Sequence, residues 1–382
     1  MRIGIVCYPT YGGSGVVATE LGKGLADKGH QVHFVSYAQP ARLDSFHPNI
    51  FFHEVRFGEY PLFEYPPYET ALASALVDVV KHCDLDILHV HYAIPHDSVA
   101  YMAKKVLLNQ DGRYIPVVTT LHGTDITLVG KDPAYAPVVQ MAINKSDGVT
   151  AVSNSLRQQT LEFFDIRNDI EVIYNFIDVA RFQKKNKEHF KRAIAPEGEK
   201  ILMHLSNFRK VKRVQDAVRV FHRVRAEVPS KLLLVGDGPE RQPVEALCRE
   251  LGLGKDILFL GKQDAVEELL AIADLLLMPS ESESFGLAAL EAMACEVPVI
   301  SSDVGGLPEV NEHGLTGFLS PVGDVDDMAG HAIGLLTDET RLQQFKANAL
   351  LRAKQYDLSV ILPQYEAYYR RVVEKATGRV LE

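Results

Sequence analysis

Apolar runs of strand length alternate with longer segments of helical periodicity along most of this 382-residue chain. The apolar run Ile3–Tyr8 is followed by a loop, Pro9–Gly13, and by an amphipathic segment, Ser14–Lys28, that predicts a helix. Runs that are apolar throughout and alternate with helices indicate a parallel sheet covered on both faces. The strands expected in the first half are Ile3–Tyr8, Gln31–Ser36, Phe51–Phe57, Leu85–Tyr92, Pro116–Leu121, Gly148–Ser153 and Glu171–Tyr174.

The same alternation starts again in the second half, where Lys212–Glu227 has the spacing of a one-sided helix. Two such series predict two doubly wound α/β domains. The boundary is expected near Asn175–Lys187, which gives domains at residues 1–178 and 179–357 and a helical C-terminal segment at 358–382. The strands expected in the second half are Lys200–Leu205, Leu232–Val235, Ile257–Leu260, Leu275–Met278 and Val297–Ser301.

The net charge of the chain limits the kinds of molecule that it is expected to bind. The formal net charge of -10 disfavours nucleic acid and anionic membrane surfaces. The N-terminus predicts a first strand and no signal peptide, and no run approaches the ~20 apolar residues of a membrane helix. We therefore expect a cytoplasmic protein that binds small molecules, with a homodimer as the assembly considered. The four cysteines, which form no C-x-x-C pair, are expected to be buried and reduced: Cys7, Cys83, Cys248 and Cys295.

Ligands of open parallel sheets bind at the carboxyl ends of the strands, so residues directly after strands are the first candidates. Pro9–Gly15 follows the first expected strand and opens a helix, and the spacing of Gly13, Gly15 and Ala18 matches the dinucleotide fingerprint. That fingerprint also needs an acidic residue after the second strand, and Phe34–Gln39 contains none. A nicotinamide cofactor is therefore disfavoured. The loop is either an anion site or a tight turn that needs glycine.

Thr119–Asp125 follows another expected strand and contains His122. This imidazole either contacts a sugar or phosphate, or is satisfied by the backbone. His89 and His91 alternate on the preceding strand, which raises the possibility of zinc, but no complete ligand set of known spacing is present. No metal is therefore expected here.

The segment Ser206–Arg213 follows a strand and places four cationic residues near a helix N-terminus: Arg209, Lys210, Lys212 and Arg213. Positive charge is unfavourable there unless an anion lies between the side chains and the helix, and a diphosphate is such an anion. The alternative is a solvated basic helix end. The glycine turn Leu234–Pro239 approaches a ligand or is a plain strand-to-helix connection.

The segment Pro279–Cys295 contains two carboxylates, Glu283 and Glu291, and a helix expected to start at Phe285–Gly286. The free amide groups at such a start suit a phosphate. Glu291 lies in an otherwise apolar helix, where an unpaired carboxylate is costly. Two sugar hydroxyls would satisfy it, and a structural salt bridge would do so equally well.

Together these motifs resemble retaining glycosyltransferases of family 4, which have the GT-B fold. The resemblance rests on Gly12-Gly13-x-Gly15, on the basic loop with Arg209 and Lys212, and on Glu283-x7-Glu291 with Phe285-Gly286. It covers essentially the whole chain. It implies two Rossmann-like domains that face a central cleft, with the C-terminal helix crossing back to the first domain.

Other segments are similar to those of family members that transfer N-acetylglucosamine from its UDP form to a malate hydroxyl. The resemblance thus implies UDP-N-acetylglucosamine as donor and L-malate as acceptor, in the first step of bacillithiol synthesis, with no cofactor. The segments are Cys7–Gly15, Tyr65–Tyr68, His89–His96, Leu121–Ile126, Tyr174–Asp178 and Ser206–Asp216.

The resemblance also implies a role for individual residues. Catalytic roles fall to Arg209, Lys212, His122 and Glu283. Donor binding falls to Gly13, Gln263, Glu283, Ser284, Phe285, Gly286, Leu287 and Glu291, and acceptor binding to Ser14, Tyr92, Thr120, Asn175 and Arg209. No metal ligand is implied, because members of this family retain the anomeric configuration without a metal.

Two departures from the family pattern stand out. Ser206-Asn-Phe208 replaces the usual Gly-Arg-Leu, so the arginine role moves to Arg209, and Glu296 replaces a glycine at a helix end. The residue pattern alone does not predict a binding pocket for a dicarboxylate such as malate. A family-4 enzyme with a sugar, lipid or phosphate acceptor, a UDP-sugar epimerase, and a non-catalytic UDP-sugar sensor are the alternatives. A phosphorylase would need a lysine-bound pyridoxal site, which the sequence does not reveal.

Overall fold

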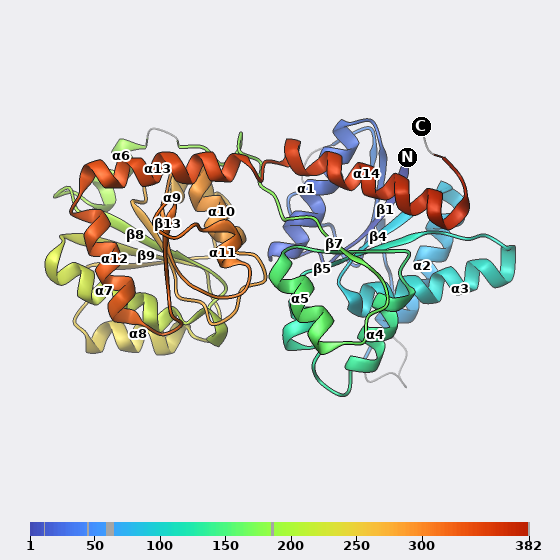
Figure 1. Ribbon diagram of the computed structural model, residues 1–382, viewed down its shortest axis with the longest axis horizontal. Helices are drawn as coiled ribbons and strands as arrows, with labels where there is room; N and C mark the ends of the chain where they lie inside the picture. The colour runs from blue at the N-terminus through green and yellow to red at the C-terminus, as the bar shows by residue number, and fades with distance from the viewer. Residues whose placement is uncertain (11, 44–45, 59–64, 185–186, 381–382) are drawn as a thin grey trace. The chain divides into compact units, whose positions relative to one another are not determined.

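The computed structural model describes residues 1–10, 12–43, 46–58, 65–184 and 187–380. The chain forms two compact units, which are described separately (Figure 1). Unit 1 contains Met1–Asn175 together with Leu358–Glu382, and unit 2 contains Phe176–Asp357. Each unit is built on one parallel sheet.

The sheet of unit 1 has the strand order β3-β2-β1-β4-β5-β6-β7, and all of its pairs are parallel. Its strands are β1 (Arg2–Val6), β2 (Gln31–Ser36), β3 (Ile50–Glu54), β4 (Ile87–His91), β5 (Val117–Leu121), β6 (Gly148–Ala151) and β7 (Ile170–Val172). They are connected through α1 (Gly13–Asp27), α2 (Tyr68–Cys83), α3 (Ser98–Asp111), α4 (Ala136–Lys145) and α5 (Asn154–Phe163), with short irregular turns η1 (Ala93–Asp97) and η2 (Thr124–Leu128). The prediction of a parallel, doubly wound sheet is confirmed.

The C-terminal helix α14 (Leu358–Thr377) belongs to unit 1. Right-handed crossovers place α2 to α5 on one face of the sheet and α1 on the other, so the second face lacks a crossover helix beyond β1. Helix α14 covers that face (Figure 1). Its Tyr368 hydroxyl donates to the Val149 carbonyl of β6 at 3.0 Å, and Leu358 packs against Gly24 of α1.

Unit 2 repeats the design with the strand order β10-β9-β8-β11-β12-β13, again parallel throughout. Its strands are β8 (Lys200–Leu205), β9 (Ser230–Val235), β10 (Ile257–Gly261), β11 (Leu275–Met278), β12 (Val299–Ser302) and β13 (Gly317–Ser320). Its helices are α6 (Glu188–Ile194), α7 (Val214–Glu227), α8 (Arg241–Glu250), α9 (Val266–Leu270), α10 (Leu287–Ala294), α11 (Leu307–Val310), α12 (Val325–Leu336) and α13 (Glu339–Lys354), with a 3-10 turn η3 (Lys210–Lys212) before α7. Strand β13 was not expected, because it contains only two large apolar residues.

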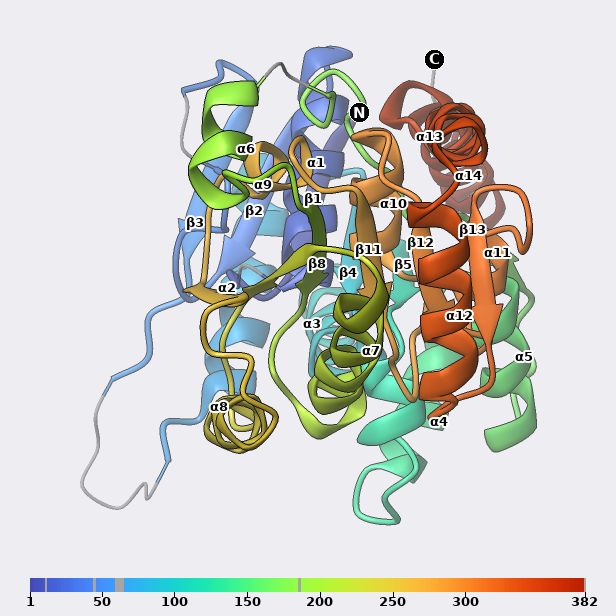
Figure 2. The same ribbon diagram turned by 90° about the vertical axis from the view of Figure 1, so that its left-hand side faces the viewer.

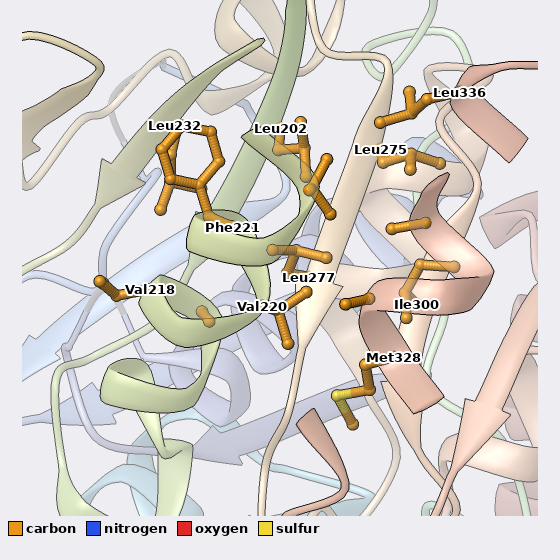
Figure 3. Packing of buried hydrophobic residues seen from close by; sticks show 14 of the residues in the cluster. Leu202, Val218, Val220, Phe221, Leu232, Leu275, Leu277, Ile300, Met328 and Leu336 are labelled. Atoms are coloured by element: carbon orange, nitrogen blue, oxygen red, sulfur yellow. The ribbon is translucent and has the colours of Figure 1, made fainter. Parts of the chain in front are cut away.

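Helices α7, α8 and α12 lie on one side of this second sheet, and α9, α10 and α13 on the other (Figure 2). Figure 3 shows how the first group forms a core: Phe221 of α7 lies beside Leu232 and Leu202, and Met328 of α12 lies beside Ile300. Helix α12 thus covers β12 and β13 on the face that the crossover helices leave open, as α14 does in unit 1.

Among the described residues, no helix is both long enough and apolar enough to cross a membrane. Helix α14 is the longest at 20 residues, and its sequence includes Glu366, Arg370, Arg371 and Glu374.

Gly148 tests the docking of α14. A Cβ atom at this position would lie 2.7 Å from Val372 Cγ2 and 2.8 Å from the Tyr368 hydroxyl. We expect Gly148→Ala to lower the free energy of unfolding by about 1–3 kcal/mol through overpacking, which calorimetry would detect as a lower melting temperature. Gly330→Ala in α12 is the control, because its Cβ would meet no atom within 4 Å. An unchanged melting temperature for Gly148→Ala would contradict close docking.

Candidate active site

The strand order of unit 1 places a switch point at β1, which pairs with β2 on one side and β4 on the other. Such a point leaves room for a ligand at the carboxyl ends of the strands. Ser14 in the first turn of α1 and Tyr92 directly after β4 meet there, with 2.6 Å between their hydroxyl oxygens. Tyr92 has a φ of 85°, a conformation that side chains rarely adopt and that often marks a functional position.

The loop between β1 and α1 is closely packed on its own backbone. A Cβ atom on Gly15 would lie 2.4 Å from the Thr10 carbonyl oxygen and 2.7 Å from that of Tyr8. This gives Gly15 a packing role of the kind that a tight turn requires. Gly13 lies exposed as the first residue of α1, and Tyr11 of the same motif lies outside the described residues.

A chain of buried polar side chains runs beneath this edge of the sheet. His91 Nδ1 lies 2.8 Å from His122 Nε2, and His89 Nε2 lies 2.7 Å from the Thr120 hydroxyl. The other ring nitrogen of His89 lies 2.7 Å from the hydroxyl of Tyr369 on α14. The structure therefore joins His91 and His122 by a hydrogen bond and places the His89 ring beside that of His91, with 4.4 Å between ring centroids. Both nitrogens of His89 are occupied by Thr120 and Tyr369.

The high pKa of one partner bears on the directions of these bonds. Burial raises the pKa of the Tyr369 phenol well above its ordinary value, so the phenol keeps its proton and can donate it to His89 Nδ1. In that arrangement neutral His89 carries its proton on Nε2 and donates to Thr120. The Thr120 hydroxyl can in turn donate to Thr150, 2.7 Å away. Thr120 is thus a buried member of the network with no exposed surface.

Burial also keeps these histidines neutral. It lowers the pKa of His89 to about 3, of His122 to about 3 and of His96 to about 4. His91 is shifted in the same direction by burial and by the neighbouring imidazoles. His122 can therefore offer a neutral hydrogen bond, and it is a weak base.

Asp125 and Asn175 complete this edge. Asp125 accepts backbone N–H groups from Ala93 at 2.9 Å and Gly123 at 3.0 Å, so it ties η1 to η2, while burial raises its pKa to about 6. Asn175 is buried, and its side-chain oxygen has no hydrogen-bond partner within the described residues. A buried polar atom without a protein partner calls for an explanation such as a ligand or ordered water.

Unit 2 has its own switch point, at β8, which lies between β9 and β11. The cationic residues that follow β8 have different surroundings. Arg213 forms an ion pair of 2.5 Å with Asp216, and Lys212 Nζ donates to Glu283 Oε1 at 2.6 Å. Arg209 and Lys210 are exposed. The structure thus brings Lys212 and Glu283 together and leaves the Arg209 guanidinium accessible.

The glycine turn after β9 supports this basic loop through its backbone. A Cβ atom on Gly236 would lie 1.8 Å from the Ser206 carbonyl oxygen, and one on Gly238 would lie 2.7 Å from that of Phe208. The Phe208 N–H also donates to the Asp237 carbonyl at 3.0 Å. Both glycines are therefore explained by close packing, as expected for a plain strand-to-helix connection.

The loop between β11 and α10 holds Glu283 from several directions. Ser280 donates its hydroxyl to Glu283 Oε1 at 2.9 Å, and the Gly306 N–H donates to the Glu283 carbonyl at 2.9 Å. A Cβ atom on Gly305 would lie 1.9 Å from the same carbonyl oxygen. The loop after β12 was not singled out from the sequence, although the rule of inspecting residues after strands applies to it equally.

Helix α10 begins at Leu287, and the expected start at Phe285–Gly286 is wrong by one to two residues. The reason is Gly286, whose φ of 99° cannot continue into a helix. Ser284 and Phe285 therefore lie in the loop, Leu287 opens the helix, and Glu291 lies half-buried on it. Only Glu291 of the two carboxylates is helical.

Two other positions from the sequence lie at the borders of unit 2 elements. Gln263 is exposed after β10 and donates its side-chain amide to the Leu260 carbonyl at 2.6 Å. Glu296, where family members often have glycine, adopts a left-handed φ of 60° after α10 and pairs with Lys184 at 3.3 Å. The backbone there has the conformation for which glycine is favoured.

The neutral histidines predict a pH dependence of stability. Between pH 6.5 and about 4 the folded protein binds fewer protons at His89, His122 and His96 than the unfolded chain does. Their contribution is complete above pH 6.5 and is lost as the pH falls, by up to about 1.4 kcal/mol per pH unit for each histidine. Urea unfolding from pH 7 to pH 4 measures this slope. His89→Gln should flatten it, exposed His82→Gln should not, and equal slopes for both variants and the unmodified protein would contradict the prediction.

Comparisons with known proteins agree with this architecture. The profile described as Glycosyltransferase Family 4 matches residues 11–181, and that of Glycosyl transferases group 1 matches residues 185–352. The chain is 50% identical to the N-acetyl-alpha-D-glucosaminyl L-malate synthase of Bacillus anthracis, over 98% of this chain and 97% of that protein. It is 25% identical to the D-inositol 3-phosphate glycosyltransferase of Thermobispora bispora, over 95% of this chain and 91% of that protein.

Solved structures show the same fold. Anabaena HepE in complex with UDP and glucose superposes with a TM-score of 0.82 at 21% identity, covering 96% of this chain and 99% of that one. The sucrose-phosphate synthase of Thermosynechococcus elongatus gives a TM-score of 0.81 at 21% identity, covering 98% and 99%. The two Rossmann-like units are those of the GT-B class. The chain belongs to the glycosyltransferases that combine a Family 4 N-terminal domain with a group 1 C-terminal domain.

Proposed function

We propose that this protein transfers N-acetylglucosamine from UDP-N-acetylglucosamine to the hydroxyl of L-malate, with retention of configuration and without a metal or cofactor, as the first step of bacillithiol synthesis. The observation that carries the proposal is the 50% identity to the B. anthracis malate synthase over nearly the full length of both chains. The arrangement of residues within each unit supports it.

Unit 2 is the proposed donor-binding unit. The loop of Ser284 and Phe285, with Gly286 and Leu287 at the start of α10, would present backbone N–H groups to the phosphates. Glu291 would accept hydrogen bonds from the ribose hydroxyls, and the turn that contains Gln263 would meet the uracil. Lys212 and Arg209 would supply the positive charge. Arg209 is exposed, and Lys212 would exchange its partner Glu283 for the diphosphate.

Unit 1 is the proposed acceptor-binding unit. Ser14 and Tyr92 share a hydrogen bond, so they act as one polar group for the acceptor. The unsatisfied oxygen of Asn175 suits a hydroxyl donor. Thr120 acts through the buried network that it shares with His89, and Gly13 at the exposed start of α1 adds an anion-favouring helix end. Arg209 is the candidate for a malate carboxylate.

The low basicity of His122 bears on the mechanism. With a pKa of about 3, this imidazole is a poor acceptor for the malate proton. The leaving diphosphate is then the better base, and the malate hydroxyl attacks on the same face of the sugar that the diphosphate leaves. Lys212, Arg209 and the N-terminus of α10 stabilise the charge that develops on the diphosphate, and neutral His122 hydrogen-bonds the sugar.

Product analysis tests the proposal directly. The protein is incubated with UDP-N-acetylglucosamine and a panel of L-malate, other hydroxy acids and inositol 3-phosphate, and the products are identified by mass spectrometry and by the anomeric coupling in NMR. We expect α-linked N-acetylglucosaminyl malate in the presence of EDTA. A glycosylated inositol phosphate would point to another family-4 acceptor. Donor turnover without any acceptor would indicate an epimerase, and UDP binding without turnover a sensor.

Lys212 tests the charge-stabilising role. We expect Lys212→Ala to lower kcat by about 10²–10³-fold, because it removes stabilisation of the leaving group, while the Kd for UDP from calorimetry changes much less. Lys210→Ala is the matched control, because this neighbour on the same turn is exposed, whereas Lys212 is the residue that donates to Glu283. Equal losses in kcat and in UDP affinity would count against a transition-state role for Lys212.

A further inference from the structure

Three side chains with metal-binding chemistry converge at an edge of unit 1 that the proposed function does not use. His33 comes from β2, His53 from edge strand β3, and Cys83 is the last residue of α2. One ligand atom from each lies within 4.8 Å of the others. In the part of the chain that the structure describes, this is the one group of three or more His, Cys, Asp or Glu side chains whose ligand atoms lie that close together.

The distances within this group are close to those of a tetrahedral site. His33 Nδ1 lies 3.0 Å from His53 Nε2, and Cys83 Sγ lies 4.0 Å from the same nitrogen. Zinc bonds of about 2.0–2.1 Å to nitrogen and 2.3 Å to sulfur place tetrahedral ligand atoms roughly 3.3–3.6 Å apart. Shifts of a few tenths of an ångström would bring these two pairs to such values, and the ligand atoms of His33 and Cys83 lie within 4.8 Å of each other.

The surroundings hold the ligands and leave access to them. The His33 ring stacks on Phe51 at 4.7 Å with 16° between the ring planes, and it stacks on His53 at 5.2 Å. His33 is 5% exposed, whereas His53 and Cys83 are half-buried, so an ion can reach the group from solvent. The Asp78 carboxylate acts electrostatically on both His53 and Cys83, which favours a cation.

We propose that His33, His53 and Cys83 form a binding site for a zinc-class divalent cation, with the fourth position open to solvent. Two imidazoles and one thiolate are a ligand set that selects such ions over magnesium or calcium. When the ion binds, the Cys83 thiol loses its proton to solvent and the sulfur becomes a ligand.

The group lies at the outer edge of the sheet of unit 1. Helix α2 starts with Tyr68, whose ring packs against Tyr37 just beyond the carboxyl end of β2 at 5.6 Å. Its last residue, Cys83, ends a helix of 16 residues, so it lies about 22 Å along the helix axis from Tyr68. His53 is on edge strand β3, which is two strands away from β1 in the sheet. The ion would therefore join edge strand β3 to the end of α2, and it would stabilise unit 1 without entering the transfer reaction.

Metal titration of the full-length protein tests the site. After dialysis against a chelator, zinc is titrated in competition with a chromophoric indicator, and cobalt is added separately to record the thiolate-to-metal charge-transfer band. We expect one tight site, a cobalt–thiolate band, and a higher melting temperature with zinc. Cys83→Ser should abolish the band, and both Cys83→Ser and His53→Gln should weaken zinc binding by more than about 10-fold.

Matched variants separate the site from general effects. Cys248→Ser replaces a thiol outside the group, and His82→Gln replaces a neighbouring histidine on α2. Both should keep the zinc affinity and the cobalt band. No binding by the unmodified protein, or binding that survives Cys83→Ser and His53→Gln, overturns the proposal, as does equal loss in the controls. Transferase assays with and without EDTA report on the proposed function independently.

Discussion

A parallel sheet wound with right-handed crossovers leaves part of one face without a crossover helix, and both units of this protein cover that part with a later helix. In unit 2 the covering helix is α12, whose Met328 joins the core over β12. In unit 1 it is α14, which comes from the end of the chain and packs on β4 and β6. The buried state of the polar residues on that face depends on this cover. His89 and Thr120 are fully buried, and His89 is kept neutral by burial beneath α14.

Much of the architecture could be predicted from local patterns. The apolar runs located the strands because a buried parallel strand is apolar on both faces, and the loops after them contain the candidate residues. Strand β13 was not predicted, because Gly317–Ser320 contains few apolar residues. The start of α10 was misplaced because Gly286 has a left-handed conformation, with Leu307 so close that any Cβ there would meet it at 2.6 Å. The start of α10 is therefore set by packing against a residue distant in the sequence, which a short stretch of sequence does not reveal.

The partners of the candidate residues were beyond the reach of sequence patterns. Lys212 and Glu283 were both singled out, yet their ion pair joins residues 71 positions apart. The pair gives each residue a compensating charge before any donor is present. Under the proposed function, a diphosphate would take over the role of Glu283 for Lys212, so donor binding exchanges one anionic partner for another. The bond between Tyr369 and His89 is a similar case, because nothing in the spacing of either segment predicts it.

The discontinuity of unit 1 has a consequence for how the chain is made. The ribosome delivers β1 to β7 first, then all of unit 2, and α14 only at the end. The hydrogen bond between His89 and the Tyr369 phenol can form only after a further 280 residues have been synthesised. During that interval unit 2 can complete its own core, whereas the first-made sheet keeps one face exposed until translation ends. Chain termination shortly before residue 358 would thus leave a finished second unit attached to an open first one, a species prone to capture by chaperones or to aggregation.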